Sequence, residues 1–172
     1  MEDPESLESS SKRVFPTAWK QKLADETKVK ETRAKAEGGN GDAMYCLGTW
    51  YGHGTNCLAV DKAQARAWYE RSAAARHPRG MASFGYYLLS GRGGPQDTAL
   101  GLVMVSQAAA FGSDVGAYYL GRAFFEGKHG LSKDRVQARF WLKKVAGCEC
   151  EYKQLSPQAI ADAARWLRAL EQ

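Results

Sequence analysis

Apolar residues recur along this chain with the spacing of amphipathic helices. Over the stretch Asp42–His53, Met44, Leu47 and Tyr51 fall at i, i+3 and i+7, which places them in one stripe along a helix. A Leu-Gly or Phe-Gly pair marks this stripe and returns 37 and then 36 residues later. No long alternation of Val, Ile and Thr predicts a strand. The pattern therefore predicts an all-α protein built from repeated helical units.

Each unit carries further residues in the same order after the glycine of its pair: a second glycine six residues on, then an aspartate, a small residue and a bulky apolar residue, with the loop of the second unit one residue shorter. These are Gly54, Asp61, Ala65 and Trp68, then Gly91, Asp97, Gly101 and Met104, then Gly127, Asp134, Ala138 and Trp141. Glycine commonly ends a helix and aspartate commonly begins one, so each unit predicts two helices joined by a loop. The glycines of the pairs, Gly48, Gly85 and Gly121, predict close helix packing because they lack a side chain.

Two further helices flank the units. Thr17 to Glu37 is rich in strong helix formers, although Trp19, Leu23 and Ala34 give it only a thin apolar stripe. Ser156 as N-cap and Pro157 at the first helical position predict a closing helix. We expect four parts: a disordered tail over 1–15, a leading helix over 16–37, three repeats over 38–147, and a loop with a capping helix over 148–172.

The junction before the first unit carries small, aromatic and Leu-Gly residues in a recognisable order: Ala36, Gly39, Ala43, Tyr45, Leu47 and Gly48. Trp68-Tyr69 and Ser72-Ala73 continue the order in the second helix. Together they resemble the Sel-one-like repeat (SLR), a relative of the tetratricopeptide (TPR) repeat, over about residues 35–147. The resemblance implies an α-solenoid, a right-handed superhelix of antiparallel helix pairs, whose leading helix is a degenerate half repeat. Arg76 departs from the pattern, where the family has glycine.

Proteins of this family are mostly adaptors, so the resemblance implies a scaffold that binds a peptide or helix of another protein on its concave face. By resemblance to TPR arrays, the inward residues lie two before, two after and six after the Leu or Phe of each pair, with Arg79 at the start of its helix. They are Tyr45, Thr49, His53, Arg79, Ala82, Tyr86, Ser90, Tyr118, Arg122 and Glu126. Tyr45 and Tyr118 also fit a packing role, since the family has tyrosine there.

Two other functions stay open at this point. The chain has 24 Lys and Arg against 19 Asp and Glu, a net charge of +5 that is spread along the sequence and indicates at most weak nucleic-acid binding. A cysteine-rich branch of the family has been linked to β-lactam hydrolysis and pairs a cysteine on each first helix with one on the second. Here Cys46 has Ser72 and Ala73 opposite it, so the regular ladder is absent. A Cys46–His53 nucleophile pair is a further alternative.

Cofactor and metal motifs are missing from the sequence. The glycine-rich stretches at 38–41 and 91–94 lack the Gly-Lys-Ser/Thr of a phosphate-binding loop. Cys148 and Cys150 are too close together for the usual zinc spacing. No apolar run approaches the length of a membrane span, and no secretory signal is visible. We therefore expect a non-enzymatic, intracellular and cytoplasmic protein with a protein partner, no small-molecule substrate, no cofactor and no metal.

Overall fold

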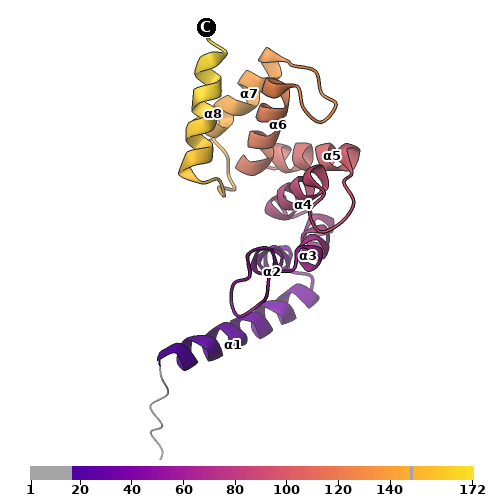
Figure 1. The fold of residues 1–172 in the computed structure, drawn as a ribbon, viewed down its shortest axis with the longest axis vertical. Coiled ribbons are helices and arrows are strands. Elements are labelled where there is room, and N and C mark those ends of the chain that lie inside the picture. Colours follow the sequence, from indigo (N-terminus) through magenta and orange to yellow (C-terminus); the bar gives the residue numbers. More distant parts are fainter. Residues whose placement is uncertain (1–16, 148) are drawn as a thin grey trace, which may run out of the picture.

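The structure of the protein is a computed structural model that describes residues 17–147 and 149–172. The predicted tail and Cys148 lie outside the described residues. The described residues form no named strand and fold into α1 (Thr17–Glu37), α2 (Gly41–His53), α3 (Lys62–Ala74), α4 (Pro78–Ser90), α5 (Thr98–Ala110), α6 (Asp114–Glu126), α7 (Arg135–Ala146) and α8 (Pro157–Ala169). The prediction of an all-α array of helix pairs is confirmed, and Figure 1 shows the helices following one another along an arc.

The regular spacing of the units corresponds to their helix ends. The glycine six residues after each pair ends the first helix in the left-handed conformation, with φ of 70°, 67° and 69° at Gly54, Gly91 and Gly127. The aspartate of each unit precedes the second helix, and the carboxylate of Asp61 accepts the Gln64 N–H at 2.9 Å. These two residue types therefore set the length of the loop in each pair.

The pair glycines allow the two helices of each unit to approach closely. A Cβ on Gly48 would lie 2.6 Å from a ring carbon of Tyr69, and one on Gly121 would lie 2.8 Å from a methyl of Leu142. Real Cβ atoms do not come this close, so any larger residue would push the helices apart. The predicted close packing at these glycines is confirmed.

The core runs through the whole array between the helix layers. Leu47 is 0% exposed and Trp68 is 7% exposed, whereas Trp141 is partly buried. The apolar stripe predicted on the leading helix does not enter this core, because Trp19 and Leu23 are 61% and 62% exposed. The buried residue of α1, Ala36, lies next to its C-terminal end.

The first helices of successive pairs lie in one row. α2 contacts α4, α4 contacts α6 and α6 contacts α8, whereas α3, α5 and α7 have hardly any contact with one another. Because the first helices pack closer to one another than the second helices do, the array bends toward the row of first helices. We call the side formed by α2, α4, α6 and α8 the inner face. The closing helix α8 thus occupies the place of a fourth first helix.

Candidate protein-binding site on the inner face

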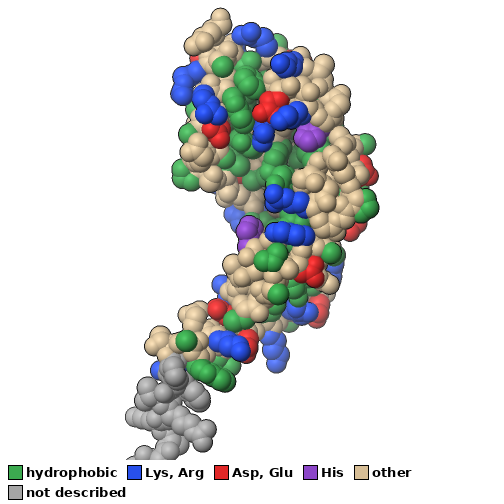
Figure 2. Space-filling model, in the orientation of Figure 1, with side chains coloured by type: hydrophobic (Ala, Val, Ile, Leu, Met, Phe, Trp, Pro, Cys, Tyr) green, Lys and Arg blue, Asp and Glu red, His purple; other side chains and the backbone are tan. Residues whose placement is uncertain are grey.

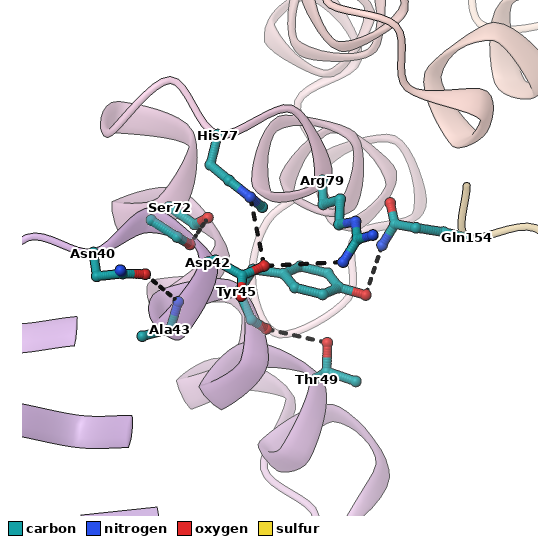
Figure 3. Close-up of polar contacts among 10 residues, drawn as sticks. Asn40, Asp42, Ala43, Tyr45, Thr49, Ser72, His77, Arg79 and Gln154 are labelled. Atoms are coloured by element: carbon teal, nitrogen blue, oxygen red, sulfur yellow. Dashed lines mark hydrogen bonds and ion pairs between the residues drawn. The ribbon is translucent and has the colours of Figure 1, made fainter. Parts of the chain in front are cut away.

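An aromatic and charged cluster lies at one end of the inner face, near the N-terminal ends of α2 and α4. The Arg79 guanidinium lies 6.0 Å from the centroid of the Tyr45 ring and 3.9 Å from the Asp42 carboxylate. His77 Nε2 lies 3.6 Å from the same carboxylate oxygen, and Figure 3 shows both side chains pointing toward Asp42. Burial and the Arg79 charge lower the pKa of His77 against the pull of Asp42, so its imidazole is neutral at pH 7.

A segment of the same chain, residues 150–155 between α7 and α8, is anchored beside this cluster, and we call it the strap. The Asp114 carboxylate, in a residue that is 5% exposed, accepts the N–H groups of Gln154 at 2.7 Å and Leu155 at 2.9 Å. The Asp114 N–H in turn donates to the Tyr152 carbonyl at 3.1 Å. The start of α6 therefore holds the strap through its backbone.

The strap also reaches the first repeat through its side chains. Gln154 Nε2 donates to the Tyr45 hydroxyl at 2.6 Å, which joins residues 109 positions apart, as Figure 3 shows. The Tyr152 ring lies edge-on to His77, with centroids 6.2 Å apart. We call this region the covered end of the inner face, because the chain already supplies the partner of its tyrosine.

The inner face is open between the C-terminal halves of α4 and α6. A hollow of about 290 Å³, the inner hollow, lies there beside the loop that follows α6. The rings of Tyr86 and Tyr119 stack in it with centroids 5.0 Å apart, and the Arg92 guanidinium lies 4.7 Å from the Tyr86 ring. Figure 2 shows apolar side chains gathered over α4, α6 and α8, with Lys and Arg side chains around them. The polar and aromatic residues that line the inner hollow are Tyr86, Ser90, Tyr119, Arg122, Lys128 and His129.

Positive charge exceeds negative charge at the inner hollow. Arg122 Nε donates to both Glu126 oxygens, at 3.1 and 3.2 Å, and Lys128 Nζ lies 2.6 Å from one of them. Burial acts to raise the pKa of Glu126, but the bonds from Lys128 and Arg122 outweigh it and lower that pKa. Burial, together with the charges of Lys128 and Arg122, lowers the pKa of His129. At neutral pH two cations therefore face one carboxylate.

The structure brings several predicted inward residues together. Tyr86, Ser90 and Arg122, which come from two different repeats, line the inner hollow, and Glu126 binds Arg122 beside it. The Ser90 hydroxyl donates to the Tyr86 carbonyl at 2.7 Å. Two other predicted residues, Tyr45 of the first repeat and Arg79 at the start of the second, meet at the covered end.

Other predicted residues are engaged within the array. The Thr49 hydroxyl donates to the Tyr45 carbonyl at 3.1 Å and accepts the Tyr69 hydroxyl at 3.3 Å. His53 is exposed, and its Nδ1 lies 2.9 Å from the Thr49 carbonyl oxygen. The Tyr118 ring packs against α8, 5.6 Å from the centroid of a Trp166 ring.

The prediction that Ala82 faces a partner is wrong. Ala82 is 0% exposed and belongs to the same core cluster as Ala108. Its methyl group is shorter than the side chains of Tyr45 and Tyr86, which pack against that cluster. An alanine at this position therefore fills the core.

Among the polar and aromatic residues of the inner hollow, the sequence prediction missed Tyr119, Lys128 and His129. Tyr119 directly precedes the Leu-Gly pair, where the first two repeats have the smaller Cys46 and Ser83, so its size was an available signal. Lys128 and His129 lie in the loop after α6, and no spacing rule connects them with α4. Only the folded chain brings them beside Tyr86 and Ser90.

His77 was also missed, although its position is informative. Asn40 and Ser113 stand at the same place in the other repeats, and each accepts a backbone N–H of its helix through its side chain. His77 makes no such capping bond. Its ring faces Asp42 and Tyr152 instead, so a departure from the capping pattern marks this member of the covered end.

Chemistry beyond binding finds little support among the described residues. They contain no group of three or more His, Cys, Asp or Glu side chains that could hold a metal ion. Burial, and then the charge of Asp42, raise the pKa of the Cys46 thiol, which disfavours the thiolate needed of a nucleophile. Across the same residues, every helix is too short or too polar to cross a membrane.

Comparison with known proteins gives a consistent result. The model of the Sel1 repeat matches residues 41–77, 78–112 and 115–146, which together are more than half of the chain. No curated protein matches the sequence. Among solved structures, a Sel1 repeat protein from Oxalobacter formigenes is 28% identical with a TM-score of 0.65, and the match covers 83% of this chain and 98% of that one.

A second solved structure is c5321, a protective antigen of uropathogenic Escherichia coli strains with an SLR fold. It is 27% identical with a TM-score of 0.61; the match covers 80% of this chain but only 32% of that longer one. Sel1 repeat proteins generally mediate protein–protein interactions, and their repeats typically form a non-catalytic scaffold. On the family match and the fold together, this chain belongs to the Sel1 repeat family.

Proposed function

We propose that the protein is an adaptor that binds a peptide segment of another protein along its inner face, with an acidic side chain of that segment in the inner hollow. The observation that carries the proposal is the meeting of Tyr86, Ser90 and Arg122 in one open hollow. These residues lie on different repeats, so a ligand that touches all of them must lie across the array.

The composition of the hollow suits this kind of ligand. Tyrosine and arginine are favoured anchors in protein interfaces because they bury a large area and also donate hydrogen bonds. A volume of about 290 Å³ accommodates one or two side chains rather than a whole helix. The cations Arg122 and Lys128, opposed by Glu126 alone, favour a carboxylate in the ligand.

A scaffold role also agrees with the absence of an assembled reactive group. His53 faces a backbone carbonyl of its own helix, and no hydrogen bond joins it to Cys46 in the described part of the chain. The residues that line the inner hollow include no cysteine. The hydroxyl of its serine, Ser90, donates a hydrogen bond to the Tyr86 carbonyl. We therefore propose no catalytic step.

The test is affinity purification from native cells with quantitative mass spectrometry, comparing the wild type with Tyr86→Ala/Arg122→Ala. A specific partner should be recovered at least ten-fold less with the double variant, because both anchors and the positive charge are lost. Lys128→Glu, at a side chain that is 52% exposed, should weaken the same partner without removing any packing.

The matched control is Phe111→Ala/Arg168→Ala, which removes an aromatic ring and a guanidinium from exposed positions outside the hollow. It should leave recovery unchanged, and circular dichroism should show the same helicity in all variants. Equal recovery with wild type, Tyr86→Ala/Arg122→Ala and Lys128→Glu would refute the proposal. Recovery of nucleic acid in place of protein, lost steeply with added salt, would also refute it.

A further inference from the structure

The outer face of α7 differs from the outer faces of the equivalent helices α3 and α5. The three positions in question lie two residues before, two after and five after the small buried residue of each second helix. They hold Ala63, Ala67 and Glu70 in α3, Ala99, Val103 and Ser106 in α5, and Val136, Phe140 and Lys143 in α7. Only the third repeat combines two large apolar residues with a cation here.

The Val136 and Phe140 side chains lie outside the core of the array. Ala138 and Leu142 on the opposite side of the helix are 0% exposed and pack in the core, whereas Val136 is 76% exposed and Phe140 is 51% exposed. Solvation of two such side chains, one turn apart on the same helix, is unfavourable. Their exposure suggests that another molecule covers them.

A hollow of about 520 Å³ accompanies this face, and Glu149 also lines it. Four cations surround the apolar pair. Lys144 Nζ lies 5.0 Å from the centroid of the Phe140 ring, so this lysine borders the apolar surface directly. The α7 residues of the hollow are Arg135, Val136, Arg139, Phe140, Lys143 and Lys144.

The cations of this face have capacity for further acidic partners. Arg135 and Arg139 each donate one guanidinium N–H group to the Leu170 carbonyl, at 2.8 Å, which fixes the end of α8 against α7. A guanidinium has five N–H groups, so most of them remain available to a ligand. Within residues 17–147 and 149–172, none of the four cations forms an ion pair.

We propose that the outer face of α7 is a second docking surface, and that its occupant is an acidic amphipathic helix of a partner protein. Val136 and Phe140 form a stripe parallel to the axis of α7, which a second helix can cover along its length. The twelve residues of α7 span about 18 Å, which corresponds to three to four turns of the partner helix. Glutamates beside its apolar stripe would meet the four cations.

The shape of the surface favours a helix over two other acidic ligands. A membrane-surface helix keeps its apolar side chains on a face apart from its cations, whereas Lys144 lies over the Phe140 ring and lines the same hollow. A nucleic acid binds chiefly through phosphates, and it would leave Val136 and Phe140 without apolar partners. Both ligands are therefore outcomes that the experiment must distinguish.

The test uses a fluorescein-labelled peptide of about 18 residues, five helical turns, with leucines at i, i+3, i+4 and i+7 and glutamates at most other positions. Fluorescence anisotropy should show binding to the full chain, at least ten-fold tighter than binding of the same peptide with every glutamate replaced by lysine. Val136→Ala/Phe140→Ala/Lys143→Glu should weaken binding at least ten-fold. This variant installs the residues that α3 already carries, so the repeat fold tolerates them.

Leu100→Ala/Val103→Ala/Ser106→Glu is the matched control, because it removes two exposed apolar residues from α5 and adds one negative charge. It should not change the affinity, and neither should Tyr86→Ala/Arg122→Ala, which separates this surface from the inner hollow. Undiminished binding by the α7 variant, or equal losses in the α5 control, would overturn the inference. So would binding of phosphatidylserine vesicles or a DNA duplex but not of the acidic peptide, or binding of none of these probes.

Discussion

The covered end and the inner hollow lie on the same inner face and use similar side chains, yet only one of them is open. Each contains tyrosine, arginine, histidine and a carboxylate. At the covered end, the Tyr45 hydroxyl already accepts a hydrogen bond from Gln154. At the inner hollow, Tyr86 and Arg122 face a space of about 290 Å³. Residue type alone therefore does not identify a binding site in this array.

The difference arises from the strap, which runs between α7 and α8 and lies across the row of first helices. Its backbone is held by the Asp114 carboxylate, which accepts two of its N–H groups in charge-assisted hydrogen bonds. The covered end thus shows how an extended segment of chain fits the inner face. A partner segment at the inner hollow would be held by side chains rather than by a buried carboxylate.

The largest expected effect comes from cutting the strap at its anchor. Asp114→Ala removes a buried carboxylate that accepts two N–H groups, and hydrogen bonds to a charged group stabilise by about 1.5–3 kcal/mol each. We expect the free energy of unfolding to fall by about 2–4 kcal/mol in urea titrations. Hydrogen exchange at the amides of residues 154 and 155 should become much faster.

Gln154→Ala is the smaller step in the same comparison, since it removes one neutral hydrogen bond to Tyr45. It should cost about 1 kcal/mol and leave the two strap amides protected. If Asp114→Ala destabilises no more than Gln154→Ala, the carboxylate is not the anchor of the strap.

Arg76→Gly, unlike the two preceding variants, should stabilise the protein, at the turn that leads into the covered end. Arg76 has φ of 57°, whereas the equivalent Gly39 and Gly112 have φ of 93° and 82°. Holding a residue with a side chain in this conformation costs about 1–2 kcal/mol. Glycine avoids this cost, but it loses more backbone entropy on folding, which cancels part of the gain. Arg76→Gly should therefore raise the free energy of unfolding by up to about 1 kcal/mol.

The Arg76 guanidinium also lies 5.6 Å from the centroid of the Phe111 ring, and the glycine variant removes this cation–ring interaction as well. Arg76→Asn serves as the comparison, because asparagine tolerates a positive φ better than most residues. A glycine variant that is less stable than the wild type would show that the interaction with the ring outweighs the backbone conformation.

The smallest effect is a pH dependence that differs between the two regions. The pKa values of His77 and His129 are both lowered from about 6.5. At a pH between the lowered pKa of a folded histidine and 6.5, the unfolded chain therefore binds more protons than the folded one. Stability conferred by neutral histidines is present above pH 6.5 and is lost as the pH falls through their folded pKa values. Urea midpoints should therefore decrease from pH 7.5 to pH 5.5, and less so in His77→Gln.

His129 should make the affinity for a ligand depend on pH, whereas His77 should not. A bound carboxylate in the inner hollow raises the pKa of His129, so affinity for an acidic ligand should increase as the pH falls through that range. His129→Gln should remove this increase, and His77→Gln should leave it intact. The same pH response in both variants would mean that the two regions do not differ in this way.

The sequence by itself determined the helices, their pairing and their family. Aspartate caps, glycine ends and the Leu-Gly contact are local rules that act within one unit, and three copies of each make the register unambiguous. The same regularity was enough to place Tyr86 and Arg122 on the inner face. It misjudged Ala82, because burial depends on the reach of neighbouring side chains.

Only the tertiary structure decided which part of the inner face is covered. Gln154 and Tyr45 are 109 residues apart, and no repeat spacing relates the strap to α2. The stacking of Tyr86 on Tyr119 likewise joins two repeats at positions that are not equivalent. Such contacts depend on the bend of the whole array and on the path of a loop outside the repeats, neither of which is encoded in the period of a single unit.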